Sequence, residues 1–169
     1  DALKLKKHPY TGFLYAGLMI KNNEPYLIEY NVRMGDPECQ VIMPRLKTDL
    51  VQLLNASVEN KLKKVKIKWI KNKCMTTVLC AKGYPNKNII NQKVDLEHIK
   101  LNKKSFIFHA GTKIKNGLLF SNGGRVLNIV VLGNSFTQIR NQIHKIIKII
   151  NWSYGFFRRD IGWRVINKK

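Results

Sequence analysis

A strand, a turn and a helix are predicted in immediate succession over residues 27–40, LIEYNVRMGDPECQ, and this stretch constrains the chain most. Alternate residues of a strand share one face, so the pattern places Glu29, Asn31 and Arg33 on the same side. The residues between them are apolar and are expected to face a hydrophobic core. These core-facing residues are Ile28, Tyr30 and Val32.

The polar face of this strand has the composition of a phosphate and metal site. Glu29 and Asn31 offer oxygen atoms that suit Mg²⁺ when the ion also carries nucleotide phosphates. Arg33 can donate two parallel hydrogen bonds to a phosphate or a carboxylate. A solvent-facing strand edge could contain the same residue types, so the spacing alone leaves both interpretations open.

The turn that follows has the signals of a helix start. Gly35 permits a sharp turn, Asp36 is a favoured N-cap residue, and Pro37 suits the first helical position. We therefore expect a helix from Pro37 to about Arg45, and the N-terminus of such a helix attracts anions. Before this region, residues 13–20 are predicted to form a buried strand that pairs with the next one through a turn at Asn22-Asn23.

The formal net charge of +21 suggests nucleic acid or anionic substrates as partners. Lys, Asn and Ile are all abundant, however, which favours a compositional origin in A- and T-rich codons. Residues 61–73, KLKKVKIKWIKNK, are the place where a nucleic acid would bind, with Trp69 as a stacking residue. The alternation of apolar residues with lysines there is typical of an amphipathic strand or an extended linker, so we consider nucleic-acid binding the weaker alternative.

The sequence contains neither a membrane-length apolar run nor a secretory leader, so we expect no membrane association. Cys39, Cys74 and Cys80 match no zinc or redox spacing, which predicts reduced thiols and a cytoplasmic location.

The second half predicts a small α+β domain. Short strands are expected at residues 75–81, 106–109, 118–121 and 126–132, and Ser135 is expected to cap a long helix. Thr48 is expected to cap a shorter helix, whose stripe of Leu50, Leu53, Leu54 and Val58 we interpret as core. The apolar stripe of the long helix comprises Phe136, Ile139, Ile143, Ile146, Ile147 and Ile150.

Two polar clusters lie in this half. Arg125 follows a pair of glycines, whose backbone can approach an anion closely while the guanidinium holds it; a turn before a strand is the alternative. Arg158, Arg159 and Asp160 follow the long helix, and we interpret them as a structural ion-pair network.

Several motifs, taken in order, resemble the phosphoribosylamine–glycine ligase family (glycinamide ribonucleotide synthetases) of the ATP-grasp superfamily. The motifs are YTGFLYAGLMI, PYLIEYNVRMGDPE, PRLKTDL, GYP, FHAGTK, NGGRVL and RRDIGWR. This resemblance implies the C-terminal part of an ATP-grasp domain, built of antiparallel strands with helices, over residues 1–60. It further implies a linker over residues 61–73 and a small α+β C-terminal domain over residues 74–169.

The resemblance also implies chemistry, in which ATP phosphorylates the carboxylate of glycine and 5-phosphoribosylamine attacks the resulting glycyl phosphate. Glu29 and Asn31 would hold Mg²⁺ or Mn²⁺ with the ATP phosphates, and Arg33 would be catalytic and substrate-binding. Gly35 and Asp36 would orient substrates. The resemblance makes Arg125 a candidate for the ribose phosphate.

The glycine-rich, phosphate-covering lid of the ATP-grasp fold is absent from these residues. We therefore expect the chain to depend on an amino-terminal part of the same enzyme and to be inactive alone. A non-catalytic fragment and a basic nucleic-acid-binding module are the alternatives.

Overall fold

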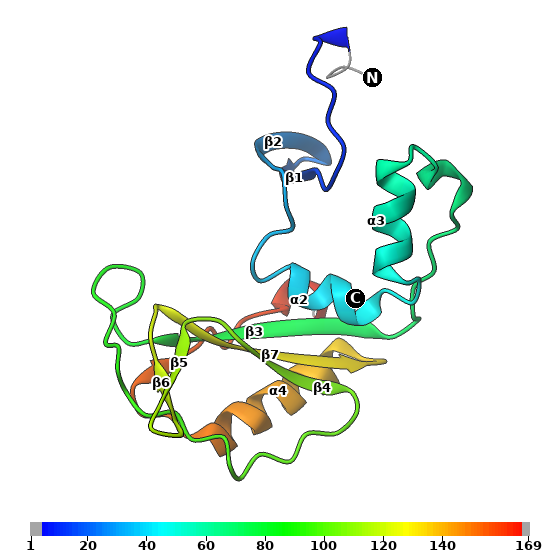
Figure 1. Cartoon of the computed structure of the whole chain (residues 1–169). Coiled ribbons are helices and arrows are strands. Elements are labelled where there is room, and N and C mark those ends of the chain that lie inside the picture. Colours follow the sequence, from blue (N-terminus) through cyan, green and yellow to red (C-terminus); the bar gives the residue numbers. More distant parts are fainter. Residues whose placement is uncertain (1–4, 167–169) are drawn as a thin grey trace. The chain divides into compact units, whose positions relative to one another are not determined.

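The computed structural model describes residues 5–166, which fall into two compact units (Figure 1). The first unit comprises Asp1–Cys39 and Leu46–Ile70, and the second comprises Gln40–Arg45 and Lys71–Lys169.

The first unit contains an antiparallel hairpin of β1 (Tyr15–Lys21) and β2 (Glu24–Asn31). Asn22 and Asn23 form its turn with φ angles of 52° and 63°. Asparagine tolerates this left-handed region better than most residues, and consecutive positive φ angles match the twist of a two-residue hairpin. The predicted hairpin is therefore confirmed, with its first strand starting at Tyr15.

Both faces of this hairpin are exposed, so the expectation of a buried first strand and of a core beneath β2 is wrong. Ile28, Tyr30 and Val32 keep 63%, 62% and 65% of their surface accessible. The reason is architectural: the strands of the hairpin make their main contacts with each other. Alternation of residue types defined two faces, but it could not supply a layer to cover one of them.

The turn after β2 is closed by Glu38, whose Oε1 accepts a hydrogen bond from the Gly35 N–H at 2.6 Å. Helix α2 (Cys39–Ile42) begins only after this turn. The predictions that Asp36 caps the helix and that Pro37 is its first residue are therefore wrong. The Glu38 side chain instead closes a turn by bonding to the Gly35 N–H, and the helix starts at Cys39. A 3₁₀ turn, η1 (Met43–Arg45), continues α2 to the expected end.

Helix α3 (Leu50–Val58) is capped by Asp49, whose side chain accepts a hydrogen bond from the Gln52 N–H at 2.8 Å. The prediction that Thr48 caps this helix is wrong. The Thr48 hydroxyl instead accepts a hydrogen bond from the Lys68 N–H at 2.7 Å, which ties the start of α3 to the returning chain.

The apolar stripe of α3 does not form a core, because Leu54 and Val58 remain 41% and 74% exposed. After α3 the chain passes through a short 3₁₀ helix, η2 (Leu62–Lys64), and then runs extended. Trp69 pairs with Leu46 in an isolated bridge at the end of this segment.

The second unit is built on a four-stranded antiparallel sheet in the order β4-β7-β3-β8 (Figure 1). A two-stranded hairpin accompanies the sheet, and helix α5 (Trp163–Ile166) ends the described chain. The sheet strands are β3 (Lys73–Ala81), β4 (Ser105–His109), β7 (Arg125–Gly133) and β8 (Gly155–Phe156), and the hairpin strands are β5 (Thr112–Lys115) and β6 (Leu118–Ser121).

Helix α4 (Phe136–Ile150) packs on β3 and β7 and supplies one side of the core. Its predicted apolar stripe is confirmed, with Phe136 half-buried at the edge of the core. The Ser135 side chain makes no capping hydrogen bond, although this residue occupies the N-cap position. The buried residues of the helix are Ile139, Ile143, Ile146, Ile147 and Ile150.

The four strands predicted in this half are confirmed, and the mixture of helices with antiparallel strands confirms the α+β class. Strands β5 and β8 were not predicted, because they have only four and two residues and carry little periodicity. Over residues 5–166, none of the helices combines the length and the apolar character required to cross a bilayer.

Candidate functional site

The side chains of Glu29 and Asn31 meet at the end of β2. Asn31 Nδ2 donates a hydrogen bond to Glu29 Oε1 at 2.9 Å, which confirms that the two residues share a face. Across the hairpin, Glu29 lies opposite Gly17, and a Cβ atom on Gly17 would lie 3.0 Å from Glu29 Cγ. Gly17 therefore lets the Glu29 side chain lie close against β1.

The donor atoms of this pair fit a hard divalent cation. Because the Asn31 amide nitrogen is bonded to one carboxylate oxygen, Asn31 Oδ1 and Glu29 Oε2 remain as oxygen ligands. The described residues contain no group of three or more His, Cys, Asp and Glu side chains that could hold a metal. A cation here would therefore take two protein ligands and complete its shell with phosphates and water, the pattern that Mg²⁺ favours.

Tyr15 and Glu38 also belong to this end of the hairpin, and neither was predicted as a site residue from the sequence. The pKa of Tyr15 is raised, first by its hydrogen bond with the Glu38 carboxylate, then by the charge of that carboxylate, by burial and by Glu29. The two carboxylates therefore both act on one hydroxyl, a concentration of negative charge that favours a cation. The available signal was a Glu three residues after Gly35, a spacing that often closes a turn.

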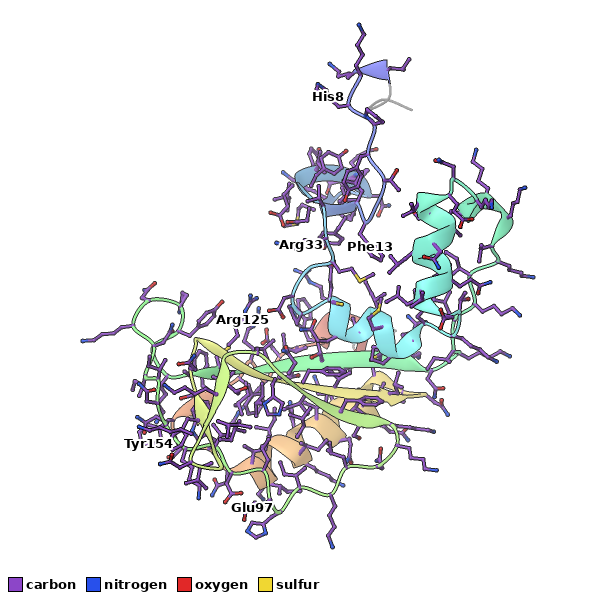
Figure 2. The ribbon with its side chains drawn as sticks, in the orientation of Figure 1. His8, Phe13, Arg33, Glu97, Arg125 and Tyr154 are labelled. Carbon is purple, nitrogen blue, oxygen red and sulfur yellow. The ribbon has the colours of Figure 1, made fainter. Side chains whose placement is uncertain are left out.

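Arg33 follows this cluster but lies beyond the strand. Because β2 ends at Asn31, strand alternation does not extend to Arg33, which sits in an exposed bend (Figure 2). Its Nη1 lies 3.4 Å from the Met34 carbonyl oxygen, and within residues 5–166 it forms no ion pair with Glu29. The guanidinium donates this one hydrogen bond to the backbone, and it has further N–H groups that could reach a ligand.

The structure does not support the prediction that a helix N-terminus beside these residues binds an anion. Helix α2 has four residues, too few for an appreciable dipole, and the Gly35 N–H already donates to Glu38. Asp36 is exposed in the turn and Gly35 is half-buried.

Arg125 belongs to the second unit, where three separated motifs meet. A Cβ atom on Gly124 would lie 2.3 Å from Tyr84 Cδ2, and one on Gly111 would lie 2.7 Å from Gly123 Cα. The Gly111 backbone thus lies against the Gly123 backbone, and the Tyr84 ring lies against Gly124, at distances that only glycine allows. Arg125 follows at the start of β7, half-buried, so it borders a cluster of turns rather than an isolated one (Figure 2).

The predicted ion-pair network after α4 is confirmed in part. Arg158 donates to Asp160 through Nε at 3.1 Å and Nη2 at 2.7 Å. This hydrogen bond is also the main reason that the pKa of Asp160 is lowered. Arg159 takes no part in the pair, so the prediction is wrong for that residue.

Comparisons with known proteins give the family. A model of the phosphoribosylglycinamide synthetase C domain matches residues 74–164, more than half of the chain. The chain belongs to the phosphoribosylglycinamide synthetase family. A model of the ATP-grasp (A) domain of the same synthetase matches residues 1–39, which include Glu29, Asn31 and Arg33. The family resemblance noted in the sequence is therefore confirmed.

Individual relatives agree with this assignment to the synthetase family. Phosphoribosylamine–glycine ligase of Brucella melitensis is 44% identical over 163 residues, which cover 95% of this chain and 38% of the relative. The ligase of Vibrio vulnificus is 45% identical over 166 residues, with 96% and 38% covered. The crystal structure of the Thermotoga maritima ligase superposes with a TM-score of 0.77 at 30% identity, covering 94% of this chain and 39% of that one. The chain thus spans about two fifths of the length of these synthetase relatives.

Proposed function

We propose that this chain is the C-terminal part of an ATP-dependent ligase that joins glycine to 5-phosphoribosylamine. The reaction yields glycinamide ribonucleotide, ADP and phosphate through a glycyl phosphate. The observation that carries the proposal is the hydrogen bond between Asn31 and Glu29, which brings together two side chains that could offer oxygen ligands, within the segment that matches the ATP-grasp domain. The names of the relatives support the choice of substrates.

In this proposal Glu29 and Asn31 hold Mg²⁺ or Mn²⁺ together with the ATP phosphates. Such a cation, when bound, offsets the negative charge of the transferring phosphoryl group. Asn31 keeps the Glu29 carboxylate oriented, and Arg33 acts as the catalytic cation that approaches the same phosphates and the glycine carboxylate. Gly35 and Asp36 then border the glycine.

Arg125 is our candidate for the phosphate of 5-phosphoribosylamine, because it follows a cluster of glycine turns. For the chain as a whole, we assign residues 1–60 to the ATP-grasp domain and residues 61–73 to a linker. We assign residues 74–169 to the C-terminal domain. The two family matches support this division.

The hairpin also supports a role for an amino-terminal part of the same enzyme as partner. A two-stranded hairpin with both faces exposed is marginally stable by itself, so the apolar residues of β1 and β2 require another layer. The remainder of an ATP-grasp domain would supply it. The three unpaired cysteines fit a reducing cytoplasm as the compartment.

The test is to measure ADP formation by the chain alone and by the chain supplied with the amino-terminal portion of a family member. We expect ADP only from the combination, and only when glycine and 5-phosphoribosylamine are both present. ADP production by the chain alone that depends on both substrates would contradict the proposed division of labour. A folded combination that makes no ADP would contradict the ligase assignment itself.

A further inference from the structure

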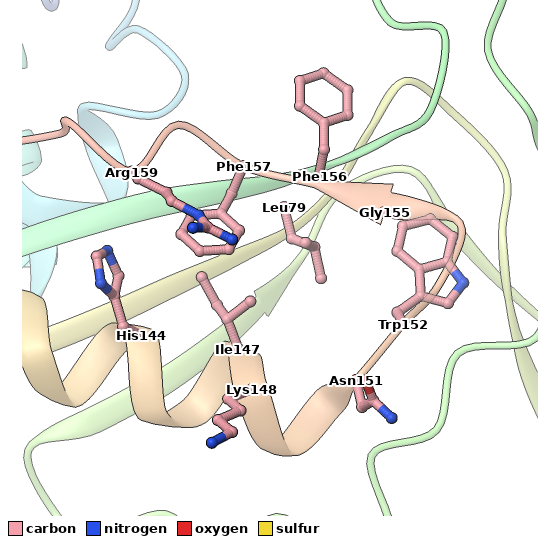
Figure 3. A pocket seen from close by; sticks show the side chains of 10 residues that line it. All are labelled: Leu79, His144, Ile147, Lys148, Asn151, Trp152, Gly155, Phe156, Phe157 and Arg159. Atoms are coloured by element: carbon pink, nitrogen blue, oxygen red, sulfur yellow. The ribbon is translucent and has the colours of Figure 1, made fainter.

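The second unit contains a cleft that the proposed ligase chemistry does not use (Figure 3). It has a volume of about 630 Å³, within the range of roughly 300–1,000 Å³ that is usual for small-molecule sites. It lies between helix α4 and the segment that leads into and out of β8. The lining residues are Leu79, His144, Ile147, Lys148, Asn151, Trp152, Gly155, Phe156, Phe157 and Arg159.

The inner wall of the cleft is apolar and aromatic. Leu79 and Ile147 are core residues whose side chains point toward the same space, and the rings of Trp152 and Phe157 flank them (Figure 3). The absence of a side chain on Gly155 leaves room for the Trp152 indole, since a Cβ atom there would lie 2.4 Å from the ring. This wall suits a flat apolar group.

The rim of the cleft is cationic and lacks a compensating acid. His144, Lys148 and Arg159 line it, and no Asp or Glu does. Within residues 5–166, Arg159 forms no ion pair, whereas its neighbour Arg158 is held by Asp160. Burial lowers the pKa of His144 most, and the charges of Arg140 and Arg159 add to this effect.

Arg159 is the cation best placed for a ligand, and His144, whose lowered pKa favours the neutral imidazole, can add a hydrogen bond beside it. The His144 ring lies 5.3 Å from the Phe157 ring, at 59°, which keeps the imidazole at the mouth of the cleft. Figure 3 shows His144 rising from α4 toward the segment that carries Phe157 and Arg159, while Lys148 extends away from it.

We propose that this cleft binds a small anion with a flat aromatic body, of the nucleoside monophosphate class. The base would lie against Phe157 and Trp152, and the phosphate would be held by Arg159 with His144 beside it. The ligase proposal needs none of these residues, so the two proposals stand or fall separately.

The test uses the full 169-residue chain with AMP as the probe. Binding is followed by calorimetry and by the NMR signal of the Trp152 indole N–H, assigned with Trp152→Phe. We expect AMP to bind and to shift this signal. We expect adenosine, which lacks the phosphate, and ribose 5-phosphate, which lacks the base, each to bind at least about tenfold more weakly than AMP.

Arg159→Gln should weaken AMP binding by about tenfold, and the matched control Arg158→Gln should change it less than about twofold. Both side chains are exposed, so both variants should fold, which circular dichroism will confirm. The proposal is overturned if AMP leaves the Trp152 signal unmoved, if ribose 5-phosphate binds as well as AMP, or if the two variants behave alike.

Discussion

Strands β2 and β7 are similar in length and differ in almost every other respect. No residue of β2 is buried, whereas most of β7 lies in the core between β3, β4 and helix α4. Yet β2 carries Glu29 and Asn31, the pair best suited to a cation. The region with the clearest chemistry thus lacks a core of its own, and the region with a core carries the stability.

This contrast has a physical reason. The site that we propose would present oxygens and a guanidinium to charged substrates, and such a site needs a rigid support to keep these groups in place. In the first unit the hairpin places Glu29 and Asn31 on one face, but few packed side chains hold the hairpin itself rigid. In the proposed enzyme that support comes from the rest of the ATP-grasp domain.

The largest expected difference is in the free energy of unfolding, when the same Ile→Ala substitution is made in each of the two regions. Ile143→Ala, in the core, should lower the free energy of unfolding by about 2–5 kcal/mol, because it leaves a cavity beneath α4. Ile28→Ala, at a residue that is 63% exposed, should change it by less than about 0.5 kcal/mol. Urea unfolding followed by circular dichroism measures both, and equal losses would abolish the distinction between the regions.

A smaller effect on stability tests whether the buried polar groups of the second unit have hydrogen-bond partners. Thr77 is 2% exposed and its hydroxyl has no hydrogen-bond partner in the described chain. Thr77→Val should therefore raise the free energy of unfolding by about 1 kcal/mol. Thr112→Val is the matched control, because the Thr112 hydroxyl contacts His109 Nδ1 at 3.0 Å and should not be improved by removal. A loss of stability in Thr77→Val would show that the hydroxyl is satisfied.

A further, pH-dependent effect concerns Cys74 on β3. Burial, opposed by the charge of Arg45, raises the pKa of the Cys74 thiol to about 11. The unfolded chain loses this proton near its ordinary pKa of 9.0. The folded chain holds more protons between these values, so its free energy of unfolding should fall as pH rises from 9 to about 11.

Iodoacetamide labelling at pH 8 measures the same difference in ionisation. Cys74 should react at least about tenfold more slowly in the folded chain than in the unfolded chain, because the thiolate is the reactive form. Equal rates in the folded chain and in denaturant would show that the second unit does not bury this strand as described.

What the sequence predicts correctly differs between the two regions in the same way. The stripe of isoleucines in α4 predicted a buried face, and the face is buried because the same domain supplies the sheet. The alternation of apolar and polar residues around Ile28 defined a face of β2 equally well. That face is exposed, because the strands of the hairpin mainly contact each other. Asn22-Asn23 fixed a turn because only the backbone was involved.

Competing polar side chains explain the errors at the helix starts. Thr48 and Asp49 are adjacent and both can cap, and the sequence alone did not show that Lys68 would take the Thr48 hydroxyl. Glu38 was missed because its role depends on the Gly35 N–H and on Tyr15, a residue of the opposite strand. Of the candidate site, the pairing of Glu29 with Asn31 could be predicted, since strand alternation alone brings the two together.

The most direct measurement is the turnover of the chain supplied with its amino-terminal portion, comparing Glu29→Gln with Glu24→Gln. Glu24 is an exposed carboxylate at the start of the same strand and serves as the control. The account predicts a loss on the order of a hundredfold for Glu29→Gln at saturating ATP and no change for Glu24→Gln. Unchanged turnover in Glu29→Gln would contradict it, because β2 would then be scaffold and the cation would be held elsewhere.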